Sequence, residues 1–285
     1  MLRLSCRILY CACLLAMAFA LPVDDANAKV NRVTGDYSEQ HIDLSVQAPG
    51  GEISVLRYYL RGRTGFNDQW EPLDLGTPDN TGLIRSMLRD GNTFTNLSVL
   101  PDLYVKDENE TISRTATGYH WKDRASGDWV DYDASGRFTA SGHLNITVAH
   151  SLYDPYGKLT GILDARGRQV LWYSYSGNNI SSVHDAANRS VSYQYDAAGR
   201  ITTFTDVLGH AWHYQYNAKG YLVKRTDPLG RTLNITYAAD GKTASVKDQD
   251  GIGASYQFSF DSKTREYYMK EASSGQVRMP RVRLP

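Results

Sequence analysis

Cysteine is almost absent from this chain of 285 residues, and the few cysteines lie close together near the N-terminus. They are Cys6, Cys11 and Cys13. If the segment that holds them is removed on export, the mature chain has no thiol. That absence excludes disulfide cross-links, a cysteine nucleophile and cysteine-ligated zinc.

An excess of charge of either sign is also missing. The 31 lysines and arginines balance the 31 aspartates and glutamates, so the formal net charge is +0 at pH 7. Proteins that bind nucleic acid usually carry a basic surplus on one face. We therefore expect neither nucleic acid nor an anionic membrane to be the main partner.

The common catalytic motifs are absent from the sequence. It contains no Gly-x-Ser-x-Gly elbow, no P-loop and no His-Glu-x-x-His segment. His210 and His213 form the one closely spaced histidine pair, and a spacing of three on a strand points side chains to opposite faces. We therefore predict a protein that is not an enzyme and that holds neither a metal nor a cofactor.

Long apolar runs are confined to the N-terminal segment. Two arginines precede the apolar run 8–20, which is too short to span a bilayer, and small residues follow at 26–28. This order predicts a secretory signal peptide over residues 1–28, and hence a periplasmic, cell-surface or extracellular protein. The alternatives are an uncleaved anchor or a lipid attached to Cys11 or Cys13.

The chain does contain a repeat with a period of 21 residues, which is the signature of a repeat architecture. Its aspartate column consists of Asp164, Asp185, Asp206, Asp227 and Asp248. Three residues later the column is Gly167, Asn188, Gly209, Gly230 and Gly251. A further turn column is Gly157, Asn178, Gly199, Gly220 and Gly241.

One repeat has the composition of a β-hairpin. In the unit 195–216, two turn signals alternate with two short runs rich in β-branched and aromatic residues. Aspartate at the start of a turn bonds the backbone two residues on, and glycine supplies the positive φ, as we expect for Gly220. The sequence therefore predicts an all-β meander of tandem 21-residue hairpins, forming a curled sheet or partial shell.

Aromatic residues recur with the same period. Trp212, Tyr214 and Tyr216 alternate along one run, so their rings are expected to share one face of the sheet. Packing within the protein is the first interpretation of such rows, and a sugar-stacking surface is the second. The candidate rings are Trp172, Tyr193, Tyr195, Trp212, Tyr214, Tyr216 and Tyr237.

One hairpin breaks the pattern. Ser174 occupies a column that otherwise holds tyrosine or phenylalanine, whereas Tyr173 and Tyr175 flank it. A β-bulge at this place could restore the facing of the rings. The turn that follows, 176–179, keeps turn-forming residues but lacks the usual Asp-x-x-Gly-Arg.

The repeat resembles that of the Rhs/YD-repeat family. Its signature, Tyr-Asp-x-x-Gly-Arg-Leu followed by Asp-x-x-Gly-Arg, is matched at 153–159 with 164–168, at 195–201 and at 132–138. The segment 33–70 is similar to the β-rich segment that opens many Rhs proteins. The resemblance implies sheets that spiral into hollow shells, which enclose a C-terminal toxin in bacteria and stand on cell surfaces in animal teneurins.

These observations divide the chain into four segments. We predict a signal peptide over 1–28, a β-rich opening region over 29–129, hairpin repeats over 130–262 and a basic, disordered tail over 263–285. The last predicted strand, 254–260, would then be an open sheet edge. We expect further Rhs repeats or a partner chain to cover it, or the protein to self-associate.

The leading functional hypothesis is a non-enzymatic, exported scaffold or shell fragment of the Rhs type. The resemblance connects such a scaffold with toxin delivery or with interactions at a cell surface. The alternative hypothesis is a module that binds carbohydrate or the cell envelope through its tyrosine and tryptophan rows, with a cell-surface glycan as its partner. Buried rings would favour the scaffold, and exposed rings would favour the binding module.

Overall fold

The computed structural model describes residues 28–60, 63–66, 70, 72–97, 99–273, 276–278 and 281–283. Every regular element in these ranges is a β-strand, which confirms the predicted all-β fold. No helix long and apolar enough to cross a membrane occurs among them. The predicted signal peptide lies almost wholly outside the described residues.

The strands form two sheets. The inner sheet contains β1 (Lys29–Val30), β2 (Tyr37–Ala48), β3 (Gly51–Leu60) and β4 (Arg63–Phe66). The curled sheet begins with β5 (Ser86–Arg89), β6 (Asn92–Leu97), β7 (Leu100–Val105), β8 (Glu110–Arg114), β9 (Gly118–Asp123), β10 (Asp128–Asp133), β11 (Phe138–His143) and β12 (Ile146–Tyr153). It continues with β13 (Leu159–Asp164), β14 (Gln169–Ser176), β15 (Asn179–Asp185), β16 (Ser190–Tyr195), β17 (Ile201–Thr205), β18 (Ala211–Tyr216), β19 (Leu222–Thr226) and β20 (Thr232–Tyr237). It ends with β21 (Thr243–Asp248), β22 (Gly253–Asp261), β23 (Glu266–Ser273), β24 (Gln276–Arg278) and β25 (Arg281–Arg283).

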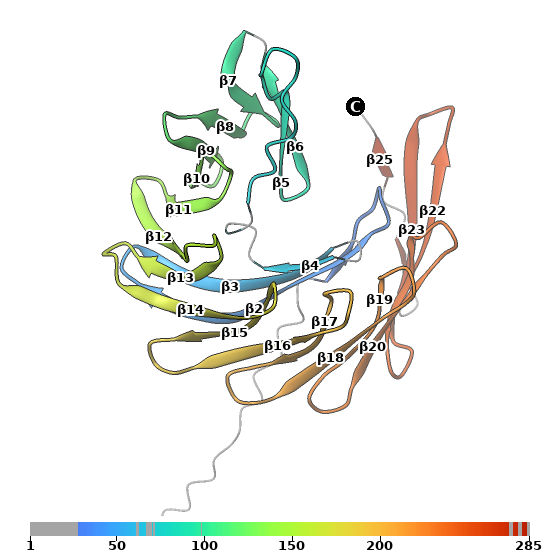
Figure 1. Cartoon of the computed structure of the whole chain (residues 1–285). Coiled ribbons are helices and arrows are strands. Elements are labelled where there is room, and N and C mark those ends of the chain that lie inside the picture. The colour runs from blue at the N-terminus through green and yellow to red at the C-terminus, as the bar shows by residue number, and fades with distance from the viewer. Residues whose placement is uncertain are drawn as a thin grey trace, which may run out of the picture.

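The curled sheet is an antiparallel meander. Each strand from β5 to β23 pairs with the next one along the chain, and β23 then pairs with both β24 and β25. Among the described residues, no ladder joins β5 to β24 or β25, so we describe the sheet as a curled strip with two ends (Figure 1). This arrangement confirms the predicted meander and partial shell.

The repeat turns have the predicted construction. In the turn that starts at Asp164, the Gly167 amide donates to the Asp164 carbonyl, and Oδ1 of Asp164 accepts from the Arg166 and Arg168 amides. The expected positive φ is confirmed at Gly220, where it is 84°. The other turn glycines with positive φ are Gly157, Gly167, Gly199, Gly209, Gly230, Gly241 and Gly251.

The irregular hairpin corrects two column assignments. The positive φ of its turn lies at Gly177, with a value of 60°, and Asn178 does not have one. The ladder from β13 to β14 shifts register between Ile162 and Leu163 and skips Val170, as a bulge does, and the regular repeats lack this shift. Tyr175 therefore fills the tyrosine column, because one extra residue before it is followed by a turn that is one residue shorter.

The C-terminal segment differs from the predicted disordered tail over 263–285. The strand β23 lies inside it and pairs with β22 along eight positions, from Ala254↔Ser273 to Asp261↔Glu266. Consequently the predicted edge strand 254–260 lies inside the sheet, paired with β21 on one side and β23 on the other. Among the described residues, the sheet ends at β24 and β25 instead.

The predicted boundary between 129 and 130 is also wrong as a structural boundary. It falls within β10, whose residues pair with β9 without interruption, as in Trp129↔Lys122 and Val130↔Trp121. The chain changes sheets between β4 and β5 instead. The first hairpins, from β5 to β9, thus belong to the same sheet as the repeats.

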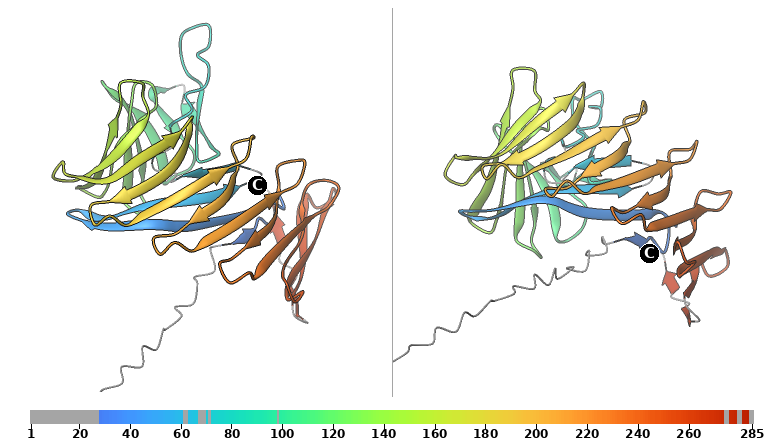
Figure 2. Two further views of the ribbon diagram at one scale, coloured as in Figure 1. Left: turned by 60° about the horizontal axis from the view of Figure 1, so that its bottom comes forward. Right: turned by 90° about the horizontal axis from the view of Figure 1, so that it is seen from below.

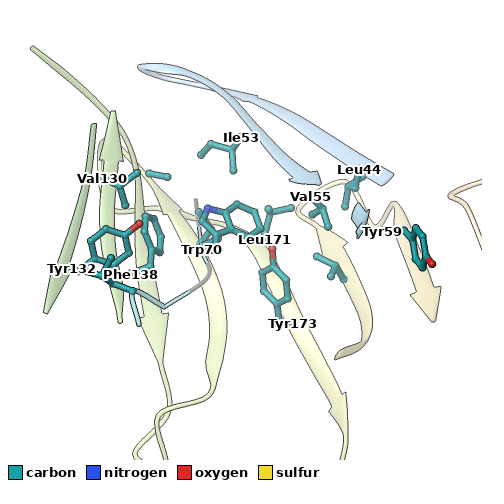
Figure 3. Packing of buried hydrophobic residues seen from close by; sticks show 14 of the residues in the cluster. Leu44, Ile53, Val55, Tyr59, Trp70, Val130, Tyr132, Phe138, Leu171 and Tyr173 are labelled. Carbon is teal, nitrogen blue, oxygen red and sulfur yellow. The ribbon is translucent and has the colours of Figure 1, made fainter. Parts of the chain in front are cut away.

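The core lies between the two sheets. The hairpin β2–β3, called the inner hairpin below, runs across the concave side of the curled sheet (Figures 1 and 2). Figure 3 shows Ile53 and Val55 of this hairpin gathered with Trp70, and with Leu171 and Tyr173 of the curled sheet. The rings of Trp70 and Tyr173 meet edge to face with centroids 5.8 Å apart. The inward side chains of both sheets therefore pack together in one shared core.

Candidate functional site

The aspartates of the repeat turns are engaged within their own turns. Oδ2 of Asp164 accepts from Nε of Arg168 at 3.0 Å and lies 2.8 Å from its Nη2. Burial opposes ionisation of Asp164, but the amide and guanidinium of Arg168 outweigh it and lower the pKa of the carboxyl. Equivalent ion pairs join Asp133 to Arg137, Asp185 to Arg189, Asp196 to Arg200 and Asp227 to Arg231.

This geometry assigns a structural task to each predicted turn residue. The carboxylate caps the amides of its turn, and the glycine or asparagine closes it. Among the described residues, no group of three histidine, cysteine or acidic side chains is close enough to hold a metal ion. The turns are thus building elements of the sheet.

The tyrosine that recurs once per repeat, called the column tyrosine below, bonds each repeat to the one before it. We call each of these hydrogen bonds a staple. The hydroxyl of Tyr195 donates to the Ile180 carbonyl at 2.8 Å, and that of Tyr216 donates to the Ile201 carbonyl at 2.8 Å. The same bond is made by Tyr153 to Phe138, by Tyr175 to Leu159 and by Tyr237 to Leu222. The bond that Tyr175 makes confirms that it, rather than Ser174, continues the column.

A cation from the preceding turn covers several of these rings. The guanidinium of Arg200 lies 4.9 Å from the ring centroid of Tyr216, and Nζ of Lys158 lies 5.2 Å from that of Tyr175. Arg137 over Tyr153 and Lys242 over Phe258 repeat the arrangement. The basic residue of Asp-x-x-Gly-Arg therefore contributes to packing between hairpins as well as to the turn.

The candidate ligand-binding rings do not form one exposed surface. Tyr193 and Tyr214 are buried against the inner hairpin, and Tyr195, Tyr216 and Tyr237 are half-buried in the staples. Trp172 stacks on His184 with centroids 5.3 Å apart, and Trp212 packs on Phe204. The packing interpretation of the rows is therefore the better one.

A buried ion pair within the inner hairpin contacts the repeats. Nε and Nη2 of Arg57, on β3, donate to the two carboxylate oxygens of Asp43, on β2, at 2.9 and 3.1 Å. The same carboxylate accepts from the Tyr193 hydroxyl at 2.8 Å. The guanidinium also lies 4.6 Å from the ring centroid of Phe204 and 5.2 Å from that of Tyr214. Burial works against the charge of Arg57, but Asp43 beside it raises the pKa of the guanidinium.

A second buried carboxylate makes a similar link. Glu39, which is 1% exposed, accepts from the Tyr37 hydroxyl at 2.8 Å and from Nη1 of Arg225 at 3.1 Å. Burial favours the neutral acid, yet His41 and Arg225 together lower the pKa of Glu39 to about 2. The two ion pairs, Arg57–Asp43 and Arg225–Glu39, are called the docking pairs below.

Sequence reasoning missed the docking pairs. The inward positions of β3 are Ile53, Val55, Arg57 and Tyr59, so a charged residue stands in an otherwise apolar, alternating column. That interruption was the available signal, because a buried charge requires a partner. Its partners on the repeats could not be named without the fold.

Comparison with known proteins agrees with the repeat geometry. The family described as RHS Repeat matches residues 173–209 and 195–232. No curated protein sequence matches the chain.

Similar solved structures include the Photorhabdus luminescens Tc holotoxin pore, with 12% sequence identity and a TM-score of 0.30. That match covers 88% of this chain and 20% of the other. Another is a TcdB2–TccC3 structure without its hypervariable C-terminal region, at 13% identity and a TM-score of 0.21, covering 87% of this chain and 20% of that one. A third is a TcdB2–TccC3–Cdc42 structure, at 14% identity and a TM-score of 0.23, covering 87% and 19%.

The chain spans about a fifth of the length of these matched chains. The likeness to this family rests on the repeat itself. The matched residues include the turns at Asp185, Asp196, Asp206 and Asp227 and the staples of Tyr195 and Tyr216. Residues 173–232 of this chain therefore contain RHS repeats.

Proposed function

We propose that the mature chain is an exported, non-enzymatic scaffold of the Rhs type, whose curled sheet forms part of a shell wall or an interaction surface. The observation that carries this proposal is the engagement of the repeated side chains. Aspartate, glycine, arginine and tyrosine of each repeat close turns or join neighbouring hairpins. Because these side chains already bond within the protein, we infer that the repeat serves to build a wall and does not form a catalytic site.

The inner hairpin supports the same role, because it fixes the curvature of the wall. It contacts the sheet at two repeats, through Asp43 to Tyr193, Glu39 to Arg225 and the Ser45 carbonyl to Arg189. These contacts hold the two repeats at a set distance from the same rigid pair of strands. The hairpin therefore acts as an internal brace for the curl.

The open end of the sheet is the expected point of assembly. The last strands, β24 and β25, are short and pair with β23 on one side. A strand at the end of a sheet offers backbone donors and acceptors to another chain. We propose that further Rhs hairpins or a partner chain add at this edge, and that the assembly serves toxin delivery or contact at a cell surface, as the family resemblance implies.

Light scattering on the mature chain, residues 29–285, tests this proposal. The wild-type chain is expected to associate as its concentration rises, and the double variant Val277→Lys with Val282→Lys is expected to remain monomeric, because charge on an edge opposes strand addition. Leu208→Lys is the matched control, since this leucine is 75% exposed on a repeat turn away from the edge.

Hydrogen exchange gives the second measurement. The amides of β25 should gain protection when the wild-type chain associates, whereas those of β16 should be protected throughout because that strand has neighbours on both sides. A wild-type chain that stays monomeric, with β25 exchanging freely at every concentration, would contradict assembly at this edge.

A further inference from the structure

An open groove of about 490 Å³ lies on the outer face of the curled sheet, over β9, β10 and the turn between β11 and β12. Alternation places its side chains on this face, because Trp121 and Val130 beside them in sequence are buried in the core. The groove is away from the inner hairpin, the repeat staples and the open sheet edge. The residues that the argument uses are His120, Trp129, Asp131, Leu144 and Asn145.

Trp129 forms the floor of the groove, with its indole lying flat on the sheet. It pairs with Gly142 of β11, where even a Cβ would overlap the indole ring. The indole Nε1 donates to the Leu144 carbonyl at 3.0 Å, and the ring lies beside His120 at 28° between planes. A glycine beneath the ring and a hydrogen bond at its edge thus hold one face of the indole toward the groove.

The turn that orients this indole is strained. Leu144 has a φ of 51°, which a branched side chain rarely adopts, and it is 66% exposed. Its amide donates to the Gly127 carbonyl at 2.7 Å, so the neighbouring turn holds it in place. Strained backbone concentrates where a site needs a group in a set position. Here the strained residue supplies the carbonyl that fixes Trp129.

Two carboxylates stand at the rim in fixed orientations. Oδ1 of Asp131 is 2.6 Å from Nδ1 of His120, and Oδ1 of Asp128 is 3.0 Å from Nδ1 of His143. The Asp131 and Asp128 side chains are 42% and 47% exposed. Each uses one oxygen on its histidine, which leaves the second as an acceptor for a ligand. The Asn145 side chain adds an amide that both donates and accepts.

We propose that this groove binds a neutral sugar ring, which stacks on Trp129 and donates its hydroxyls to Asp128 and Asp131. An open aromatic face suits the C–H face of a pyranose, and fixed carboxylates suit its equatorial hydroxyls. Lys122 and Arg124 also line the groove and nearly balance its carboxylates, so the site has no strong preference for an ion. The proposal does not depend on shell assembly.

Binding of defined sugars to the mature chain tests the proposal. The probes are the methyl glycosides of glucose, galactose and N-acetylglucosamine and the trisaccharide of β-1,4-linked N-acetylglucosamine. The readouts are saturation-transfer NMR of the sugar, which does not depend on Trp129, and in the wild type the NMR shift of the indole N–H. We expect saturable binding of at least one probe, weakened about tenfold or more by Trp129→Ala, since a stacking contact is lost.

Trp172→Ala is the matched control. Trp172 also lies on the outer face and also stacks on a histidine, but it does not line the groove. Its replacement should leave the affinity unchanged. Asp131→Asn, which keeps the shape of the side chain and removes its charge, should weaken binding without changing the melting temperature. No saturable binding by any probe, or binding that survives Trp129→Ala, would overturn the proposal.

Discussion

The curled sheet and the inner hairpin are stabilised over very different distances along the chain. In the repeats, an aspartate bonds amides within four residues, and each tyrosine hydroxyl reaches a carbonyl about one hairpin away, as in Tyr216 to Ile201. The inner hairpin instead joins residues 150 or more positions apart, through Asp43 to Tyr193 and Glu39 to Arg225.

The difference separates two kinds of information in the sequence. The local bonds occur in every repeat, so the sheet keeps most of them when one is lost. The docking pairs occur once each and are buried. We therefore expect substitutions in the docking pairs to cost much more stability than equivalent substitutions in a repeat, and the following experiments test this comparison.

The largest effect is expected for Arg57→Met. This change leaves the carboxylate of Asp43 buried without its cation, which typically costs about 3–5 kcal/mol of the free energy of unfolding. Urea unfolding measures the loss, and Arg231→Met is the control in a repeat turn, where the side chains of Arg231 and its partner Asp227 are 57% and 15% exposed. The control should cost less than about 1 kcal/mol.

A paired variant separates charge from packing at the same place. Arg57→Met combined with Asp43→Leu removes both charges, and stability should recover much of the loss, since well-packed apolar groups often replace a buried ion pair. If the double variant were no more stable than Arg57→Met alone, packing of the guanidinium on Phe204 and Tyr214 would be the larger contribution.

Acid should weaken the attachment of the inner hairpin through Glu39. The pKa of Glu39 is lowered from 4.5 to about 2, so the folded state binds fewer protons than the unfolded state between these values. Its contribution, about 3 kcal/mol, is thus complete above about pH 4.5 and is lost as the pH falls toward 2. Urea unfolding between pH 6 and pH 2.5 checks this, since Glu39→Gln should show a weaker pH dependence than the exposed control Glu52→Gln.

A moderate effect is expected for a turn glycine in open space. Gly209 has a φ of 83° and no atom within reach of an added Cβ, so Gly209→Ala tests backbone strain alone and should cost about 1–2 kcal/mol. Gly209→Asn should cost less, since Asn188 already occupies the equivalent turn with a φ of 60°. Equal melting temperatures for wild type, Ala and Asn variants would contradict the assigned turn.

The smallest effect is expected for a single staple. Tyr216→Phe removes the hydrogen bond to the Ile201 carbonyl and keeps the ring, so the free energy of unfolding should fall by about 1 kcal/mol. Tyr156→Phe is the control, because this ring is 91% exposed on a turn. Thermal melting of both variants measures the difference, and equal shifts would count against the staple.

The same contrast explains what the sequence could predict. The spacing of Asp164 and Gly167 was enough to predict the turn, because both partners of its hydrogen bond lie within four residues of each other. The place of Tyr175 was missed because a bulge at Val170 and a shorter turn after Tyr175 offset each other, which a fixed period hides. The strand β23 was missed because pairing with β22, rather than its own pattern, orders it.

The docking pairs illustrate the limit of such reasoning most clearly. Arg57 interrupts an apolar column, which indicates a buried partner, but the sequence offers many aspartates. The identity of Asp43 follows from the pairing of β2 with β3, and that of Tyr193 follows only from the path of the whole curl. The groove at Trp129 has no repeat signature at all, and the fold alone brings its residues together.

The docking pairs also constrain the order in which the chain can mature. Glu39 is synthesised 186 residues before its partner Arg225, so the first strands must wait, with their charges in water, while most of the sheet is made. Each repeat, by contrast, can join the previous one as soon as its own tyrosine emerges. The wall can therefore grow one hairpin at a time in the direction of synthesis, and the bond between Glu39 and Arg225 can form only after β19 has been made.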